Sequence, residues 1–152
     1  MHQKAAQWIV GLLGDRSIPY LICGGLAAKG YGSTRELNDI DLFVPGEHFQ
    51  CVVQAGEDYI SKASDHYREE GWDLTYVQFQ YDGIKVEVGN ADGSKILDAG
   101  SQTWIPLNID FSRYNTVHLL GLELHVMLKE DLIKYKTALS RSVDLEDIRV
   151  IG

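Results

Sequence analysis

The sequence is poor in cysteine and proline and has no excess of basic residues. Of its 152 residues only two are cysteine, Cys23 and Cys51, and only three are proline. The two cysteines form no CxxC or Cys/His pattern, which excludes a disulfide framework and a zinc site of ordinary spacing. We expect both to be reduced thiols in apolar surroundings. The net charge of −8 argues against a non-specific nucleic-acid binder, which would carry a basic surface.

Long hydrophobic runs are also missing. The N-terminal stretch MHQKAAQWIVGLLGDR has too short an apolar run and too many polar residues for a signal peptide or a membrane span. We therefore expect a cytoplasmic protein with no membrane partner. The length suits a single domain over 1–152, with a core over about 18–90 and a C-terminal hairpin and helices over about 114–152.

Apolar periodicity and turn residues predict a mixture of strands and helices. This order indicates an α/β (α+β) fold in which helices flank a small mixed sheet. The expected helices cover residues 2–14, 26–32, 46–63, 129–139 and 144–151. The expected strands cover 18–23, 39–44, 72–81 and 84–90, with a hairpin over 114–126 and an irregular stretch over 90–113.

The stretch NDIDLFVP raises a chemical question. Read with a period of two, it places Ile40 and Leu42 on one face of a strand and Asp39 and Asp41 on the other. Two carboxylates on one face of an apolar strand repel each other, and a positive group between them would relieve the repulsion. In the later strand IKVEV, Glu87 likewise alternates with apolar residues.

If these two strands are neighbours in the sheet, Asp39, Asp41 and Glu87 converge. Three such carboxylates suit Mg²⁺, a hard cation that prefers oxygen ligands and also takes substrate phosphates. The alternative is that the aspartates are solvated charges at a strand end and that Glu87 is an ordinary surface residue of a half-buried strand. These residues alone leave both interpretations open.

Two adjacent glycines, Gly24 and Gly25, follow the first apolar strand. A Gly-Gly turn that opens a helix lets backbone N–H groups approach phosphate oxygens, although a plain tight turn uses the same residues. Other phosphate motifs fail here. Tyr31 and Gly32 stand where a Walker loop needs Lys and Ser/Thr, and GYGSTR ends in Arg where a dinucleotide fingerprint needs Gly.

Together these residues resemble the polymerase-β-like nucleotidyltransferase superfamily, in particular its small bacterial members. The resemblance rests on Gly-Gly, thirteen intervening residues, Asp-Ile-Asp-Leu and a later Val-Glu-Val. Arg35 stands four residues before Asp39, as it often does in the family, but Leu37 occupies a position where Thr is usual. The ending KEDLIKYKTALSRSVDLEDI also resembles the C-terminal helices of the small members.

The resemblance implies attack of an acceptor hydroxyl on the α-phosphate of a nucleoside triphosphate, with release of pyrophosphate. Asp39 and Asp41 would hold two Mg²⁺ ions, and Glu87 would share the metal at the attacking oxygen and help to deprotonate the acceptor. The residues expected to hold the triphosphate are Gly24, Gly25, Arg35 and Lys136.

The acceptor is not identified by the sequence. Small members of the superfamily modify antibiotics, proteins or tRNA ends, and at a net charge of −8 an RNA acceptor would need a local basic patch. The rival interpretation is a catalytically silent nucleotidyltransferase-fold protein that acts as an antitoxin, subunit or nucleotide sensor. Leu37 is the feature that favours it.

The helix over 129–139 singles out Lys136. At about 100° per residue, Lys136 lies about 80° from Leu128, on the flank of the apolar stripe, whereas Lys134 points away. Its ammonium could reach a cleft, or its stem could simply cover the core edge. The charges near the next helix are interpreted as helix-start charges: Arg141, Asp144 and Asp147.

Trp104 and the histidines carry weaker signals. Trp104, in the predicted irregular stretch, is expected either to stack on a base or to cover the core. His118 and His125 flank the glycine of the second hairpin and are predicted to be ordinary strand residues.

Overall fold

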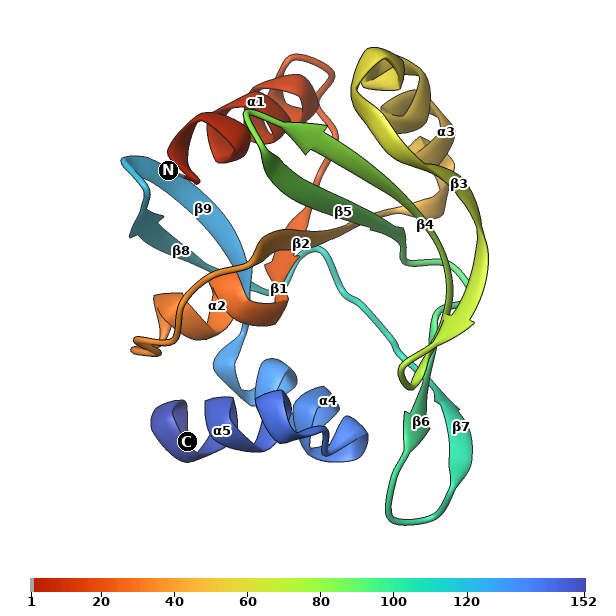
Figure 1. The fold of residues 1–152 in the computed structure, drawn as a ribbon, viewed down its shortest axis with the longest axis vertical. Coiled ribbons are helices and arrows are strands. Elements are labelled where there is room, and N and C mark those ends of the chain that lie inside the picture. Colours follow the sequence, from red (N-terminus) through yellow and green to blue (C-terminus); the bar gives the residue numbers. More distant parts are fainter. Residues whose placement is uncertain (1) are drawn as a thin grey trace.

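A single mixed β-sheet runs through the protein (Figure 1). The structure is a computed structural model that describes residues 2–152. The strands are ordered β7-β6-β4-β5-β2-β1-β9-β8, and β3 pairs with β4. They are β1 (Leu21–Cys23), β2 (Asp39–Val44), β3 (Ile60–Glu69), β4 (Trp72–Tyr81), β5 (Ile84–Asn90), β6 (Lys95–Asp98), β7 (Thr103–Pro106), β8 (Tyr114–Leu119) and β9 (Leu122–Met127).

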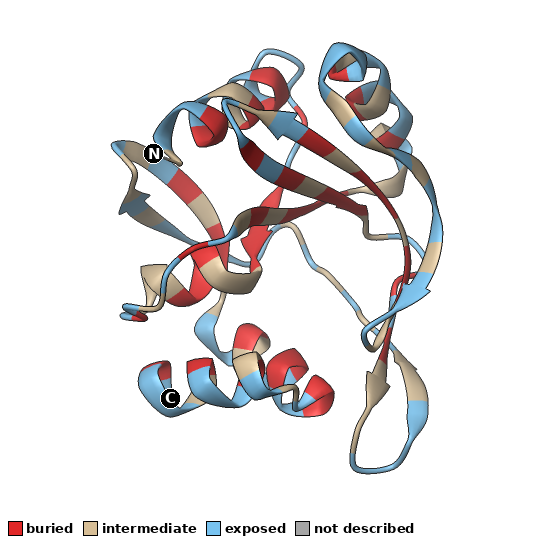
Figure 2. Cartoon of the chain, in the orientation of Figure 1, coloured by how far each residue is buried: buried red, intermediate tan, exposed pale blue. Residues whose placement is uncertain are grey.

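The helices lie on two sides of this sheet. Helices α1 and α3 pack over β5 on one side, and α4 and α5 form a pair near α2 and β6 on the other (Figure 1). Figure 2 shows buried residues along the central strands and on the inward sides of the helices. The helices are α1 (Gln3–Gly14), α2 (Gly24–Gly30), α3 (Gly46–Ala55), α4 (Lys129–Leu139), α5 (Ser142–Ile151) and a short 3-10 turn over Glu57–Tyr59.

The pairing of the central strands decides which side chains share a face. Ile40 of β2 lies opposite Val86 of β5, which lies opposite Phe79 of β4. Trp8 of α1 makes an edge contact with Phe79 at 5.3 Å between ring centroids, so this face packs against α1. Side chains alternate along a strand, so the side chains of the next residue pair, Asp41 and Glu87, point to the opposite face of the sheet.

Most of the predicted elements are confirmed, as is the α/β (α+β) fold class with a mixed sheet. The hairpin of β4 and β5 turns at Asp82 and Gly83, both with positive φ. His118 and His125 are strand residues of β8 and β9, as predicted. Of the helices described here, none is long and apolar enough to cross a bilayer.

The prediction of a helix over 46–63 is wrong beyond Ala55. Helix α3 ends at Ala55, and at the next residue, Gly56, an added Cβ would lie 2.6 Å from the ring of Phe79. The residues from Ile60 onward alternate between half-buried and exposed, the period of a strand, and they pair with the edge of β4 as β3. The open hydrogen-bonding edge of β4 therefore overrides local helix propensity.

The prediction of an irregular stretch over 90–113 is wrong over 95–106. Ile96 pairs with Ile105 in the hairpin of β6 and β7, which joins the sheet at β4. Trp104 lies on β7, half-buried, with the guanidinium of Arg68 at 5.1 Å from its ring centroid. Trp104 is not part of the hydrophobic core, contrary to one of the two expectations for it.

The two cysteines differ in environment. Cys23 is buried at the end of β1, as predicted, but Cys51 is exposed on α3. Helix α3 buries Phe49 and Val52 instead, which lie on the side of the helix that faces the sheet. The expectation of a buried thiol at Cys51 is wrong. Apolar neighbours in the sequence do not show which side of a helix faces the core, and Cys51 lies on the other side.

Candidate active site

The three predicted carboxylates meet on one face of the sheet. Strand β2 runs parallel to β5, and Asp41 lies directly opposite Glu87. Asp39 is two residues before Asp41 and shares its face. One carboxylate oxygen of each residue lies within 4.8 Å of one oxygen of each of the others. The convergence predicted from the sequence is therefore present, because β2 and β5 are neighbours.

Among the described residues, no basic side chain forms an ion pair with this cluster of Asp39, Asp41 and Glu87. Burial, and then repulsion from Asp39 and Glu87, raises the pKa of Asp41 well above its usual value. Burial, and then Asp39, also raises the pKa of Glu87. The charged form of the cluster is therefore costly without a cation.

The donor set fits a hard divalent cation. All three groups offer oxygen, the ligand that Mg²⁺ prefers, and their spacing lets one ion contact more than one carboxylate. Each carboxylate is only partly buried, so water and substrate oxygens can reach the remaining coordination positions. Asp39, Asp41 and Glu87 are thus the residues that could hold a metal.

The cluster forms one wall of a cavity of about 220 Å³. Trp72 and Tyr76 of β4 contribute aromatic side chains, and Tyr135 and Arg141 contribute from α4 and the start of α5. The remaining lining residues are Cys23, Gly24, Asp39, Asp41, Leu42, Phe43, Glu69, Glu70, Leu74, Glu87 and Gly89. The cavity therefore combines acidic residues with an apolar, aromatic surface.

Gly24 lies directly beside the cluster, at the start of α2. Its φ is +62°, and an added Cβ would lie 2.6 Å from Oδ2 of Asp41. The backbone N–H of Gly24 donates a hydrogen bond to Oη of Tyr135 at 2.8 Å. At Gly25 an added Cβ would instead meet Nη2 of Arg35 at 3.0 Å. Gly24 is therefore required by its backbone conformation and its close neighbour, whereas a side chain at Gly25 would need only a small shift of Arg35, whether or not a phosphate binds there.

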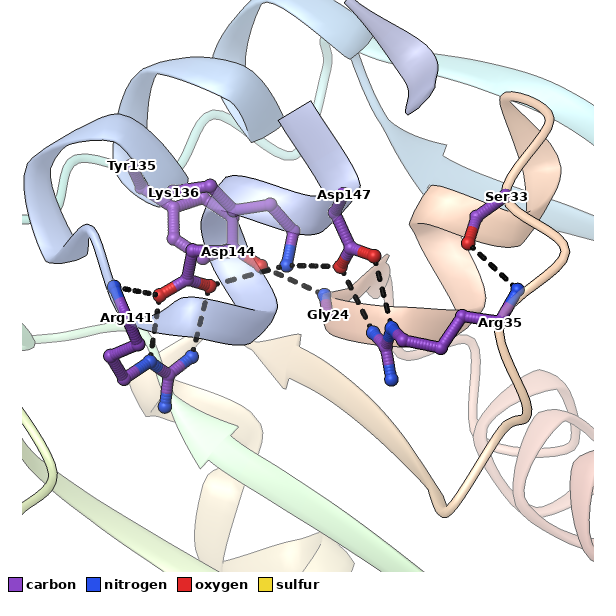
Figure 3. Close-up of polar contacts among 8 residues, drawn as sticks. All are labelled: Gly24, Ser33, Arg35, Tyr135, Lys136, Arg141, Asp144 and Asp147. Atoms are coloured by element: carbon purple, nitrogen blue, oxygen red, sulfur yellow. Dashed lines mark hydrogen bonds and ion pairs between the residues drawn. The ribbon is translucent and has the colours of Figure 1, made fainter. Parts of the chain in front are cut away.

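Arg35 and Lys136 belong to a row of alternating charges (Figure 3). Arg35 donates two hydrogen bonds to Asp147, at 3.0 and 2.9 Å. The Lys136 ammonium lies 3.0 Å from Asp147 and 3.4 Å from Asp144, and Arg141 donates to Asp144 at 2.7 and 3.1 Å. This row holds α4, α5 and the segment before β2 together.

The interpretation of Asp144 and Asp147 as helix-start charges covers only part of their role. Asp144 does accept a hydrogen bond from the backbone N–H of Arg141, which caps α5. Both aspartates are nevertheless completely buried, and both bind side-chain cations. Arg35 and Lys136 lower the pKa of Asp147 against the opposing effect of burial, which is the larger single influence. A charged carboxylate is stable there only because it is paired.

Sequence reasoning placed Lys136 at the edge of the core, and the structure encloses it almost completely, with 3% of its side chain exposed. The cavity residues Tyr135 and Arg141, and the aromatic residues Trp72 and Tyr76 of β4, were not predicted from the sequence. For Arg141 the available signal was its spacing from Asp144, because residues three apart are neighbours on a helix.

Comparison with known proteins supports the fold. No protein-family model matches the chain, and no curated protein sequence matches it. A predicted nucleotidyltransferase of Thermotoga maritima (TM1012) is similar in structure, with a TM-score of 0.74 at 21% identity over 96% of this chain and 89% of that one. The lincosamide antibiotic adenylyltransferase LnuA, solved with lincomycin, has a TM-score of 0.65 at 16% identity over 97% and 94%.

A third similar structure is ANT(2")-Ia in complex with adenylyl-2"-tobramycin, with a TM-score of 0.63 at 16% identity over 99% of this chain and 87% of that one. These levels of identity are too low to transfer an activity, but the coverage is nearly complete on both sides. The chain therefore has the nucleotidyltransferase fold, as its resemblance to the polymerase-β-like superfamily implied.

Proposed function

We propose that this protein is a metal-dependent nucleotidyltransferase that transfers a nucleoside monophosphate from a nucleoside triphosphate to an acceptor hydroxyl. The observation that carries the proposal is the convergence of Asp39, Asp41 and Glu87, without a protein counter-cation among the described residues, on the wall of a cavity. The fold shared with nucleotidyltransferases is independent support.

In the proposed reaction the acceptor oxygen attacks the α-phosphorus while the bond from that phosphorus to the bridging oxygen breaks. The acceptor hydroxyl loses its proton, and pyrophosphate leaves with the bridging oxygen. Asp39, Asp41 and Glu87 would hold two Mg²⁺ ions, which when bound activate the nucleophile and stabilise the leaving oxygen. Glu87, which lies opposite Asp41, would help to take the proton of the acceptor.

The nucleotide side of the site is proposed to comprise Gly24, Gly25, Arg35 and Lys136. The Gly24 amide already donates to Tyr135, so a phosphate would share or replace that bond. Arg35 lies against Gly25 and holds Asp147, and Lys136 holds both buried aspartates. In this proposal the two cations contribute positive potential and keep the C-terminal helices in place behind the phosphates.

For the acceptor we favour a small molecule over a protein or an RNA. Glu70 adds negative charge to the cavity beyond the three metal-binding candidates, and Glu69 adds a charge that Lys62 partly offsets at 3.2 Å. This balance disfavours a polyanionic acceptor. LnuA and ANT(2")-Ia, which share the fold, were solved with an antibiotic and an adenylylated antibiotic respectively. A hydroxyl-bearing small molecule with positive charge fits these observations.

The proposal is tested by titrating Mg-ATP, Mg-GTP, Mg-CTP and Mg-UTP into wild type and Asp41→Asn by calorimetry. We expect wild type to bind at least one of them and Asp41→Asn to lose that binding while remaining folded. Asp110→Asn, which removes an exposed carboxylate that does not line the cavity, is the matched control and should bind like wild type. Failure of wild type to bind any Mg-nucleotide would refute the proposal and favour the silent-fold interpretation.

A further inference from the structure

The cavity beside the carboxylate cluster has very uneven charge. Five of its lining residues are acidic, namely Asp39, Asp41, Glu69, Glu70 and Glu87. Arg141 is the single lysine or arginine among the described residues that line it. A nucleoside triphosphate carries several negative charges, and metal ions at the cluster would neutralise those near the α-phosphate. The remaining phosphates need another cation, and Arg141 is the one that borders the cavity.

The guanidinium of Arg141 is held in a fixed direction by a buried partner. Its Nε and Nη2 donate to the two oxygens of Asp144 at 2.7 and 3.1 Å, and Asp144 is completely buried. A guanidinium has five N–H groups, so those not bound to Asp144 can donate elsewhere. Such a two-pronged contact orients the group at little further cost in side-chain entropy.

The other two cations of the row are less well placed. Lys136 is enclosed between Asp144 and Asp147, and Arg35 uses the same two nitrogens, Nε and Nη2, to bind Asp147. Neither lines the cavity. Figure 3 shows Arg141 and Arg35 at opposite ends of the row, with the Arg141 guanidinium directly beside Asp144. Among these three, Arg141 alone therefore combines a fixed direction with access to the cavity.

We infer that Arg141 binds the non-transferred phosphates of the nucleotide, and that Asp144, itself held by Lys136, positions the Arg141 guanidinium for this contact. The inference rests on the proposed function. In the transfer reaction Arg141 would donate hydrogen bonds to oxygens of the departing pyrophosphate, where negative charge develops as the bond to the α-phosphorus breaks. Arg141 itself exchanges no proton in this step.

The test separates phosphate recognition from general stability. The probes are whichever Mg-nucleoside triphosphate binds wild type, the corresponding monophosphate, and magnesium tripolyphosphate, which has no base. We expect Arg141→Gln to weaken binding of the triphosphate and of tripolyphosphate by about tenfold or more, the effect of losing charge-assisted hydrogen bonds. Binding of the monophosphate should stay unchanged. Arg141→Lys keeps the positive charge but not the planar guanidinium that can bind two oxygens at once, so its triphosphate affinity should lie between those of wild type and Arg141→Gln.

Two further variants control for folding and charge. Arg149→Gln removes an exposed arginine from the same helix and should bind all three probes like wild type. The single change Arg141→Gln leaves the buried Asp144 carboxylate without its arginine partner. The double variant Arg141→Gln/Asp144→Asn also removes that carboxylate, and it should show the same selective loss of triphosphate and tripolyphosphate binding.

The outcomes are distinguishable. If wild type binds the triphosphate and the folded Arg141 variants bind it equally well, or lose triphosphate and monophosphate binding alike, the inference is overturned and the proposed function stands. If wild type binds no Mg-nucleoside triphosphate, the proposed function fails and this inference fails with it.

Discussion

The carboxylate of Asp41 lies against the backbone of Gly24, so that a Cβ added at Gly24 would lie 2.6 Å from Oδ2 of Asp41. No real Cβ makes such a contact, and the φ of +62° at Gly24 also disfavours other residues. The turn that opens α2 and the position of a candidate metal ligand are therefore set by the same glycine.

We predict that Gly24→Ala destabilises the protein and displaces Asp41. The left-handed backbone costs about 1 kcal/mol and the steric overlap adds to it, for a total loss of about 2–4 kcal/mol in the free energy of unfolding. Gly83→Ala is the matched control, since Gly83 has a φ of +78° but nothing within 4 Å of an added Cβ. Urea unfolding of both variants isolates the contribution of the steric contact with Asp41. An equal loss of unfolding free energy in Gly24→Ala and Gly83→Ala would contradict the prediction.

The acidic cluster predicts an unusual pH dependence of stability without added metal. Because the pKa values of Asp41 and Glu87 are raised in the folded protein, chiefly by burial, the folded state holds protons that the unfolded state releases. Their contribution to stability is complete below about pH 4, where the unfolded carboxyls titrate, and falls as pH rises through the folded pKa values.

Replacing Asp41 with Asn should therefore raise the melting temperature of the metal-free protein more at pH 8 than at pH 5. Added Mg²⁺ should stabilise wild type at pH 8 and leave Asp41→Asn unchanged, because a ligand stabilises only the state that binds it. Glu57→Gln, an exposed acid of the 3-10 turn, is the control and should keep the Mg²⁺ response. Thermal melts with and without Mg²⁺ at both pH values measure all these effects, and an equal response in Asp41→Asn would exclude this metal site.

The buried Lys136 predicts a large structural effect. Lys136→Met leaves Asp144 and Asp147 in the protein interior with one cationic partner each, which should cost about 3–5 kcal/mol of unfolding free energy. Lys134→Met, on the exposed side of the same helix, should change stability by less than about 0.5 kcal/mol. Urea unfolding measures both. A loss as small as that of Lys134→Met would mean that Arg35 and Arg141 suffice to neutralise the two aspartates.

The two thiols should differ sharply in reactivity. Cys51 is exposed on α3, whereas Cys23 is buried and its pKa is raised well above the usual value, first by burial and then by Asp41. Because the thiolate is the reactive form, a thiol reagent such as Ellman's should modify one cysteine quickly in the native protein and the second only after unfolding. Cys51→Ser should remove the fast reaction, and fast modification that persists in this variant would contradict the burial of Cys23.

The sequence by itself determined much of the site. Alternation with a period of two placed Asp39 and Asp41 on one face of their strand and Glu87 on the non-core face of another, and Asp82-Gly83 marked the hairpin that carries Glu87. These signals are local, since they depend only on backbone geometry within a few residues. The same local signals predicted the terminal helices, because their apolar residues recur at helical spacing.

Tertiary structure alone decided the rest, because it depends on which strands and helices become neighbours. The parallel pairing of β2 with β5 brings Asp41 opposite Glu87, and the open edge of β4 makes residues 60–63 the start of a strand in place of the end of a helix. Lys136 becomes a buried link between two aspartates because α5 packs on α4. These charge pairs join two different helices, so they depend on how the helices pack, and the periodicity within one helix cannot encode them.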